Sequence, residues 1–91
     1  MRLSAYTIEW SNHAAKQFKK VKDKKFAQRI IEVIEREIAM NPLLGKPLSE
    51  PFKGARSYRI GRLRILYKPD MEKLTTVILR VEHRKSVYRL Q

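Results

Sequence analysis

The strongest structural signal in this chain lies in residues 56–67, which read Arg56-Ser57-Tyr58-Arg59-Ile60-Gly61-Arg62-Leu63-Arg64-Ile65-Leu66-Tyr67. Arginines alternate here with apolar and aromatic residues, and successive side chains of a β-strand point to opposite faces of the sheet. Gly61 interrupts the pattern and suits a tight turn. The segment therefore predicts two strands, at about 56–60 and 62–68, joined at Gly61.

The alternation in the second of these strands sorts its side chains between two surfaces. It places Leu63, Ile65 and Tyr67 on one face, and Arg62 and Arg64 on the other. A sheet of this kind packs a core against its apolar face and presents guanidinium groups on the opposite face. Guanidinium groups fixed on a rigid sheet suit phosphate, because each one offers several N–H donors in a planar fork.

The last long strand is expected at 74–81, where β-branched residues are abundant. Val77, Leu79 and Val81 share one face of this strand, and we expect them to face the core. The opposite face then carries Ile78, Arg80 and Glu82. Pairing with the neighbouring strand would bring two pairs of arginines together, namely Arg62 and Arg64 beside Arg80 and Arg84.

The first half of the chain predicts a strand followed by two helices. Alternating Tyr6, Ile8 and Trp10 indicate a strand at about 5–10. Ser11 and Asn12 can cap a first helix and Asp23 a second, because these side chains accept bonds from free backbone N–H groups. The second helix has a buried face with helical spacing, made of Phe26, Ile30, Val33, Ile34 and Ile38. Asn41-Pro42 ends that helix, and residues 42–54 are expected to form a loop.

These elements follow the order β-α-α-β-β-β within a single domain that spans residues 1–91. The expected fold class is α+β, with a helical hairpin packed on one face of a mainly antiparallel four-stranded sheet. The second face of the sheet would then be available for a ligand.

Charge is the most unusual property of the composition. The 91 residues include 21 Lys and Arg against 9 Asp and Glu, which gives a net charge of +12, and no cysteine. Such an excess indicates a polyanionic partner, either nucleic acid or an acidic protein segment, with a general solubility effect as the alternative. The apolar runs are too short for a membrane span and no secretion signal is evident, so the expected location is cytoplasmic.

Residues 83–88 carry most of the chemical variety, and include His83, Arg84, Lys85 and Tyr88. Histidine transfers protons near neutral pH, the basic side chains stabilise developing negative charge, and tyrosine offers a phenol or a stacking ring. The structural alternatives are a core-facing His83 and a Tyr88 that anchors the chain end. No spacing of a metal site or of a glycine-rich phosphate loop is present, so we expect neither metal nor cofactor.

The chain resembles the RelE/ParE superfamily of toxins from bacterial and archaeal toxin–antitoxin pairs, and within it the RelE branch. The resemblance covers almost the whole chain, and its more specific parts are residues 59–67 and 83–88. It implies a toxin that enters the ribosomal A site and cuts messenger RNA there. In that reaction the ribose 2′-hydroxyl attacks the adjacent phosphate and leaves a 2′,3′-cyclic phosphate and a 5′-hydroxyl. The resemblance also implies a cognate antitoxin with an acidic binding segment, in a toxin–antitoxin hetero-oligomer.

The resemblance implies catalytic roles at a few positions. Arg64 and Arg84 would hold the scissile phosphate, while Tyr88 would orient the nucleotide and assist deprotonation of the 2′-hydroxyl. His83 is a candidate base or acid. The segment between the arginine and the tyrosine is two residues shorter than in the best-known RelE pattern, which leaves the choice between Arg84 and His83 open. The best-known RelE pattern also has a second lysine in its second strand, whereas the nearby position in this chain is Gly61.

The remaining cationic positions are expected to bind flanking phosphates, and they are Arg59, Arg62, Arg80 and Lys85. A second function on the same fold is open: a ParE-like toxin that inhibits DNA gyrase without cutting RNA. A third is an inactive relative that only binds an antitoxin or DNA. The segment 83–88 favours cleavage, because a gyrase inhibitor has no need for side chains directed at a phosphate.

Overall fold

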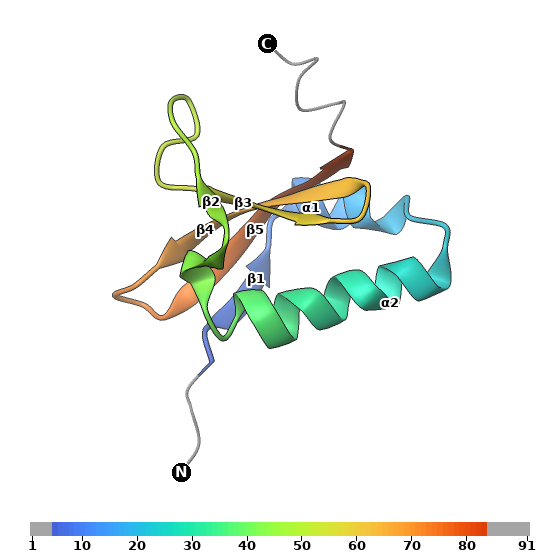
Figure 1. The fold of residues 1–91 in the computed structure, drawn as a ribbon, viewed down its shortest axis with the longest axis horizontal. Coiled ribbons are helices and arrows are strands. Elements are labelled where there is room, and N and C mark those ends of the chain that lie inside the picture. Colours follow the sequence, from blue (N-terminus) through green and yellow to red (C-terminus); the bar gives the residue numbers. More distant parts are fainter. Residues whose placement is uncertain (1–4, 84–91) are drawn as a thin grey trace.

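The computed structural model describes residues 5–83, and Figure 1 shows how their helices and strands are arranged. In chain order the elements are β1 (Thr7–Trp10), α1 (Asn12–Lys19), α2 (Lys24–Val33), η1 (Ile34–Ile38), η2 (Pro42–Leu44), β2 (Lys46–Pro47), β3 (Arg56–Ile60), β4 (Leu63–Asp70) and β5 (Thr75–His83). The expected order of elements is confirmed, with one further short strand, β2. That strand was expected to be loop, because two residues that include a proline show no alternation.

The five strands form one sheet in the order β1-β5-β4-β3-β2. β1 runs parallel to β5, with Thr7 opposite Thr75, and every other neighbouring pair is antiparallel. The expected α+β class with a mainly antiparallel sheet is therefore confirmed. The sheet has five strands rather than four, because Lys46 and Pro47 pair with the start of β3.

Both main helices begin at the expected caps. Oγ of Ser11 accepts a hydrogen bond from the backbone N–H of Ala14 at 3.0 Å, and Oδ1 of Asp23 accepts one from Phe26 at 3.1 Å. α2 continues into the π-helical turn η1, which extends the apolar stripe to Ile38. Within residues 5–83, none of the helices is long and apolar enough to cross a membrane.

The core lies between the helices and one face of the sheet. Its buried side chains come from α1, α2, η1 and three strands: Ala14, Ile30, Val33, Ile34, Ile38, Ile60, Leu63, Ile65, Tyr67, Ile78 and Val81. A single cluster joins both helices to Leu63, Ile65 and Tyr67, so the expected inward face of β4 is confirmed. The helices therefore cover the same face of the sheet (Figure 1).

A bulge in β5 changes which of its side chains face the core. Leu66 of β4 stands opposite Arg80, but the next residue, Tyr67, stands opposite Ile78, so Leu79 is an extra residue in β5. Ile78 is fully buried in the core, whereas Val77 and Leu79 line a hollow on the other face. The expectation that Val77 and Leu79 face the core and Ile78 faces away was wrong, because the extra residue shifts the alternation by one position.

Candidate functional site

The sheet face opposite the helices carries a row of charged side chains across three strands. Arg59 of β3 stands opposite Arg64 of β4, and Arg64 stands opposite Glu82 of β5. Residues directly opposite each other in neighbouring strands share a face. Because Arg64 lies between the buried Leu63 and Ile65, the row is on the face turned away from the core.

Arg80 belongs to the same face, one step further along the ladder. Its partner in the register is Leu66, two residues after Arg64, so Arg64 and Arg80 project from the same side of the sheet. The register agrees with the sequence-based expectation that these two arginines share a face. We refer to Arg59, Arg64, Arg80 and Glu82 together as the arginine face.

Arg80 is held between a carboxylate and an aromatic ring. Its Nη1 lies 2.8 Å from Oε2 of Glu82, and its guanidinium carbon lies 5.7 Å from the centre of the Phe52 ring. Phe52 comes from the loop between β2 and β3. The side chain of Arg80 is 31% exposed and that of Glu82 only 6%. The guanidinium group therefore has a fixed position and keeps donors that a ligand can reach.

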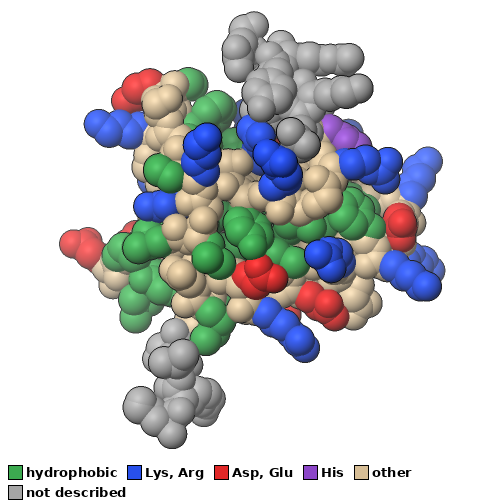
Figure 2. Space-filling view, viewed as in Figure 1, with side chains coloured by type: hydrophobic (Ala, Val, Ile, Leu, Met, Phe, Trp, Pro, Cys, Tyr) green, Lys and Arg blue, Asp and Glu red, His purple; other side chains and the backbone are tan. Residues whose placement is uncertain are grey.

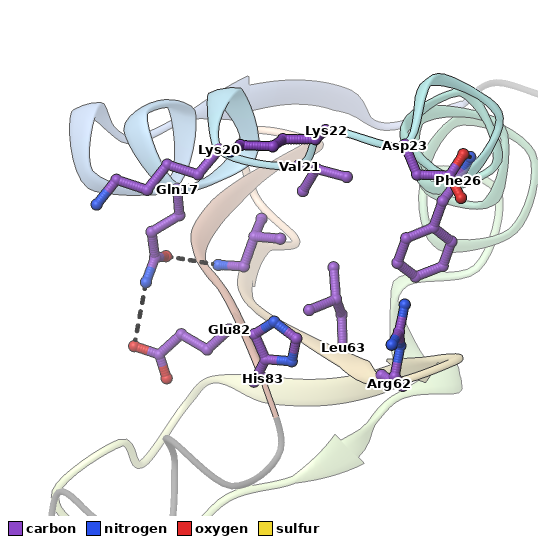
Figure 3. A pocket seen from close by; sticks show the side chains of 11 residues that line it. Gln17, Lys20, Val21, Lys22, Asp23, Phe26, Arg62, Leu63, Glu82 and His83 are labelled. Carbon is purple, nitrogen blue, oxygen red and sulfur yellow. Dashed lines mark hydrogen bonds between the residues drawn. The ribbon is translucent and has the colours of Figure 1, made fainter.

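Gln17 of α1 holds the other partner of this pair. Its Nε2 donates to Oε2 of Glu82 at 3.3 Å, and its Oε1 accepts from the backbone N–H of Val81 at 2.7 Å (Figure 3). β1 ends at Trp10, opposite Ile78, so it does not extend to this N–H. The Gln17 amide thus takes the place of a neighbouring strand and also orients a carboxylate.

Gln17 is a residue that sequence reasoning missed. A usable signal was present, because Gln17 lies one turn after the buried Ala14 and beside Phe18, on the inner side of α1. A polar side chain on the inner side of a helix needs a hydrogen-bond partner. The identity of that partner depends on how α1 packs on β5, which no local pattern contains.

Arg62 and His83 do not project from the sheet face that carries Arg64. Arg62 belongs to the turn between β3 and β4, and His83 stands opposite the buried Leu63, on the side of the helices. Both line a hollow of about 460 Å³, whose wall also includes Gln17, Lys20, Phe26 and Glu82 (Figure 3). Glu82 therefore borders both this hollow and the arginine face. The expectation that Arg62 shares a face with Arg64 was wrong, because β4 begins only at Leu63.

Two tyrosines of the sheet have structural contacts on the helix side. The hydroxyl of Tyr67 donates to the carbonyl of Pro42 at 2.7 Å and accepts from the N–H of Gly45 at 2.8 Å. Burial raises the pKa of Tyr67 above its usual value. The hydroxyl of Tyr58 donates to the carboxylate of Glu37 at 2.6 Å, and this hydrogen bond raises the pKa of Tyr58.

Three of the predicted site residues, Arg84, Lys85 and Tyr88, lie outside the described residues, and their roles stay predictions. Within residues 5–83, no three His, Cys, Asp or Glu side chains gather closely enough to hold a metal ion. Figure 2 shows basic side chains over much of the visible surface and acidic ones scattered between them, consistent with the net charge of +12. A surface of this kind attracts polyanions.

Comparison with known proteins gives a consistent family. Residues 8–88 match the family described as the ParE toxin of type II toxin–antitoxin system, parDE. Toxin RelG of Mycobacterium tuberculosis is 36% identical over 85 residues, which cover 92% of this chain and 97% of that protein. The match therefore extends over nearly the full length of both chains.

Solved structures show the same fold. A chain of the toxin–antitoxin complex RelBE2 from Mycobacterium tuberculosis superposes with a TM-score of 0.82 at 33% identity, covering 91% of this chain and 95% of that chain. A mutant of the E. coli toxin RelE in the free state superposes with a TM-score of 0.74, covering 97% and 100% of the two chains. Its identity is only 14%, so this second likeness concerns the fold alone.

Proposed function

This chain belongs to the RelE/ParE superfamily of toxins from type II toxin–antitoxin systems, and we propose that it cleaves messenger RNA in the ribosomal A site. The observation that supports cleavage most is the arginine face, where Arg59, Arg64 and Arg80 share one surface of the sheet. Such a surface suits successive phosphates, because guanidinium groups are permanently charged and donate in a planar fork. Toxin RelG is 36% identical to this chain, and a chain of the complex RelBE2 is 33% identical. Their names favour the RelE branch over the ParE branch.

In the proposed reaction the 2′-oxygen of a ribose attacks the adjacent phosphorus. The bond from the 2′-oxygen to phosphorus forms as the bond from phosphorus to the 5′-oxygen breaks, which leaves a 2′,3′-cyclic phosphate and a 5′-hydroxyl. The 2′-hydroxyl loses a proton and the departing 5′-oxygen gains one. Negative charge accumulates on the phosphate oxygens in the transition state, where fixed cationic groups stabilise it.

Arg64 suits the charge-stabilising role, because the buried residues on either side of it in β4 fix its backbone. Arg84 is proposed as the second group on the scissile phosphate. Tyr88 is proposed to orient the nucleotide and to assist deprotonation of the 2′-hydroxyl. Arg84 and Tyr88 both lie outside the described residues, and the resemblance to RelE toxins is what supports their roles.

Arg59, Arg80 and Lys85 are proposed to bind the phosphates that flank the cut. Arg62 and His83 line the hollow on the helix side of β5. RNA that contacts the arginine face and also these two residues must therefore pass around the end of β5, which is at His83. A role of His83 in proton transfer requires the reacting atom to lie on that side.

We also propose an antitoxin partner in a hetero-oligomer, by analogy with the toxin–antitoxin complex RelBE2. The net charge of +12 favours a partner segment that is acidic. Such a segment would block the toxin by covering the same cationic surface that we assign to RNA.

One observation favours a second candidate function. The description of the matching family names ParE toxins, which supports inhibition of DNA gyrase without RNA cleavage. The fold does not separate the two functions, because function depends on the site that a fold carries. The arginine face favours cleavage, since it presents cations where a phosphate chain can lie.

Induction of the protein in bacteria separates the two candidates. Messenger 5′ ends would be mapped by primer extension, and a DNA-damage reporter would be read in the same cells. We expect cuts within translated codons and no early damage response. Intact messages with an induced damage response would contradict RNA cleavage and favour gyrase inhibition. Arg36→Ala removes an exposed arginine of η1 and is the control that should still cut.

A further inference from the structure

The position of Arg80 depends on a contact that begins in helix α1. The same carboxylate oxygen, Oε2 of Glu82, pairs with Nη1 of Arg80 at 2.8 Å and accepts from Nε2 of Gln17 at 3.3 Å. Glu82 is buried, and a buried carboxylate needs partners that replace its lost hydration. Among the described residues its hydrogen-bond partners are one amide, which lies on the helix side, and one guanidinium group, which lies on the arginine face.

Gln17 is well suited to orient Glu82, because its own amide is fixed at both ends. Its Oε1 accepts from the N–H of Val81 at 2.7 Å, which leaves Nε2 as the end that meets the carboxylate. An amide turned the other way would place N–H against N–H and oxygen against oxygen. The Val81 contact therefore determines which end of the amide faces Glu82.

We propose that Gln17 is a positioning residue for RNA binding, which orients Glu82 so that Glu82 holds the guanidinium group of Arg80 at the arginine face. Gln17 acts through Glu82 rather than by contacting RNA. The RNA-binding part of this inference rests on the proposed function, whereas the orientation of Arg80 rests on the geometry alone. Within residues 5–83, the contact that would still hold Arg80 without Glu82 is the one with the Phe52 ring.

Gln17→Glu isolates this role. Glutamate has nearly the same shape, and one of its oxygens still accepts from the N–H of Val81. Its other oxygen brings a negative charge to the place where Gln17 donates to Glu82, and the two carboxylates repel. We expect Glu82 to turn away and Arg80 to lose its partner. Gln28→Glu makes the same change of charge at an exposed position of α2 and is the matched control.

The first measurement needs no RNA. Nitrogen-15 NMR of the full-length protein would report the guanidinium signal of Arg80, identified by its loss in Arg80→Ala. A held guanidinium group rotates slowly, and we expect this restriction to disappear in Gln17→Glu and to persist in Gln28→Glu. An Arg80 signal unchanged in Gln17→Glu would overturn the proposal, whether or not the protein cleaves RNA.

The second measurement is the rate of cleavage of ribosome-bound message at increasing substrate concentration. We expect Gln17→Glu to raise KM about tenfold, the loss of about one charged hydrogen bond (~1.4 kcal/mol), and to keep kcat within about twofold. A merely structural role would produce a partly unfolded sample, with a lower kcat and an unchanged KM. That result would contradict positioning.

A double-mutant cycle gives the sharpest distinction. In an Arg80→Ala background, Gln17→Glu should have no further effect on KM, because the group that it positions is absent. Losses that simply add would show that Gln17 acts elsewhere, and would overturn the proposal. If Gln17→Glu does not fold, Glu82→Gln serves instead, since it keeps the shape and removes the charge that holds Arg80. An unchanged Arg80 signal in Glu82→Gln would likewise contradict the proposal.

If the protein cleaves no RNA, the proposed function fails while the NMR measurement still tests the orientation of Arg80. If it cleaves RNA but Arg80 keeps its signal in Gln17→Glu, the inference fails and the proposed function stands. The two failures are therefore distinguishable from each other.

Discussion

Arg64 combines a fixed backbone with an outward side chain. Its neighbours in β4, Leu63 and Ile65, are both buried in the core, so the strand cannot shift without disturbing that packing. The side chain of Arg64 projects from the opposite face of the sheet, where Arg59 of β3 and Glu82 of β5 stand directly across from it. A cation placed in this way needs little reorganisation when charge develops on a phosphate.

Replacing Arg64 should therefore reduce catalysis without unfolding the protein. Arg64→Ala is expected to lose at least ~2 kcal/mol of transition-state stabilisation, about 30-fold in rate. The measurement is single-turnover cleavage of a ribosome-bound message, with Arg36→Ala as the control that removes an equal charge from an exposed site. Full activity of Arg64→Ala would remove this residue from the site.

Tyr67 joins the sheet to the segment that follows the second helix. Its buried hydroxyl bonds to the carbonyl of Pro42 and the N–H of Gly45. Tyr67→Phe leaves both groups without this partner, and we expect the free energy of unfolding to fall by about 1–3 kcal/mol. Urea unfolding would measure the loss. Tyr58→Phe, which removes a hydroxyl with an exposed contact, should cost less, and equal losses would contradict this explanation.

The raised pKa of Tyr67 adds a dependence on pH. Burial keeps the hydroxyl protonated in the folded protein at a pH where the unfolded chain, with its value near 10.0, already releases the proton. The stabilising contribution is therefore complete below that value and is lost as the pH rises through the folded pKa. Urea unfolding of Tyr67→Phe at alkaline pH should show a shallower loss of stability than the unaltered protein shows.

At the scale of elements, local patterns predicted what local physics decides. Ser11 and Asp23 were identified as caps because a cap needs only its own helix, and both are confirmed. The bulge beside Leu79 and the short strand β2 were missed, because each depends on pairing with a distant segment. A single extra residue in β5 was enough to exchange the expected positions of Ile78 and Leu79.

Helix α1 and strand β5 are connected by side chains beyond the end of β1. Oγ of Ser11 accepts from the N–H of Ala14 and donates to the carbonyl of Leu79, each at 3.0 Å. Ser11→Ala removes both bonds, and we expect a loss of about 1–2 kcal/mol in unfolding free energy. Thermal or urea unfolding would measure it, with the exposed Asn12→Ala as control. Equal stability of Ser11→Ala and the unaltered protein would contradict this link.

At the scale of the whole molecule, alternation and charge predicted a cationic sheet face, and the register brings Arg59, Arg64 and Arg80 together there. The same reasoning misplaced Arg62, because the length of a turn is not encoded in alternation. It also missed Gln17, because the contact with Glu82 arises only when the helix packs on the sheet. The predicted roles of Arg84, Lys85 and Tyr88 stay predictions.

The net charge of +12 predicts that the proposed binding of RNA depends on salt. Phosphate contacts release counterions, so log K should fall linearly with log salt, by about 0.7 per contact for single-stranded RNA. Arg59→Ala should lower the steepness by about one contact, whereas Arg36→Ala should leave it unchanged. Fluorescence anisotropy with a short RNA over a range of salt would measure both slopes. Equal slopes for the two variants would place Arg59 outside the RNA contact.

The most direct measurement is to incubate purified ribosomes, programmed with a defined message, with the toxin and to identify the new RNA ends. We expect a cut in the A-site codon, with a 2′,3′-cyclic phosphate upstream and a 5′-hydroxyl downstream, and a much slower cut by Arg64→Ala. An intact message on ribosomes, together with inhibition of supercoiling by DNA gyrase at the same toxin concentration, would contradict RNA cleavage by the arginine face.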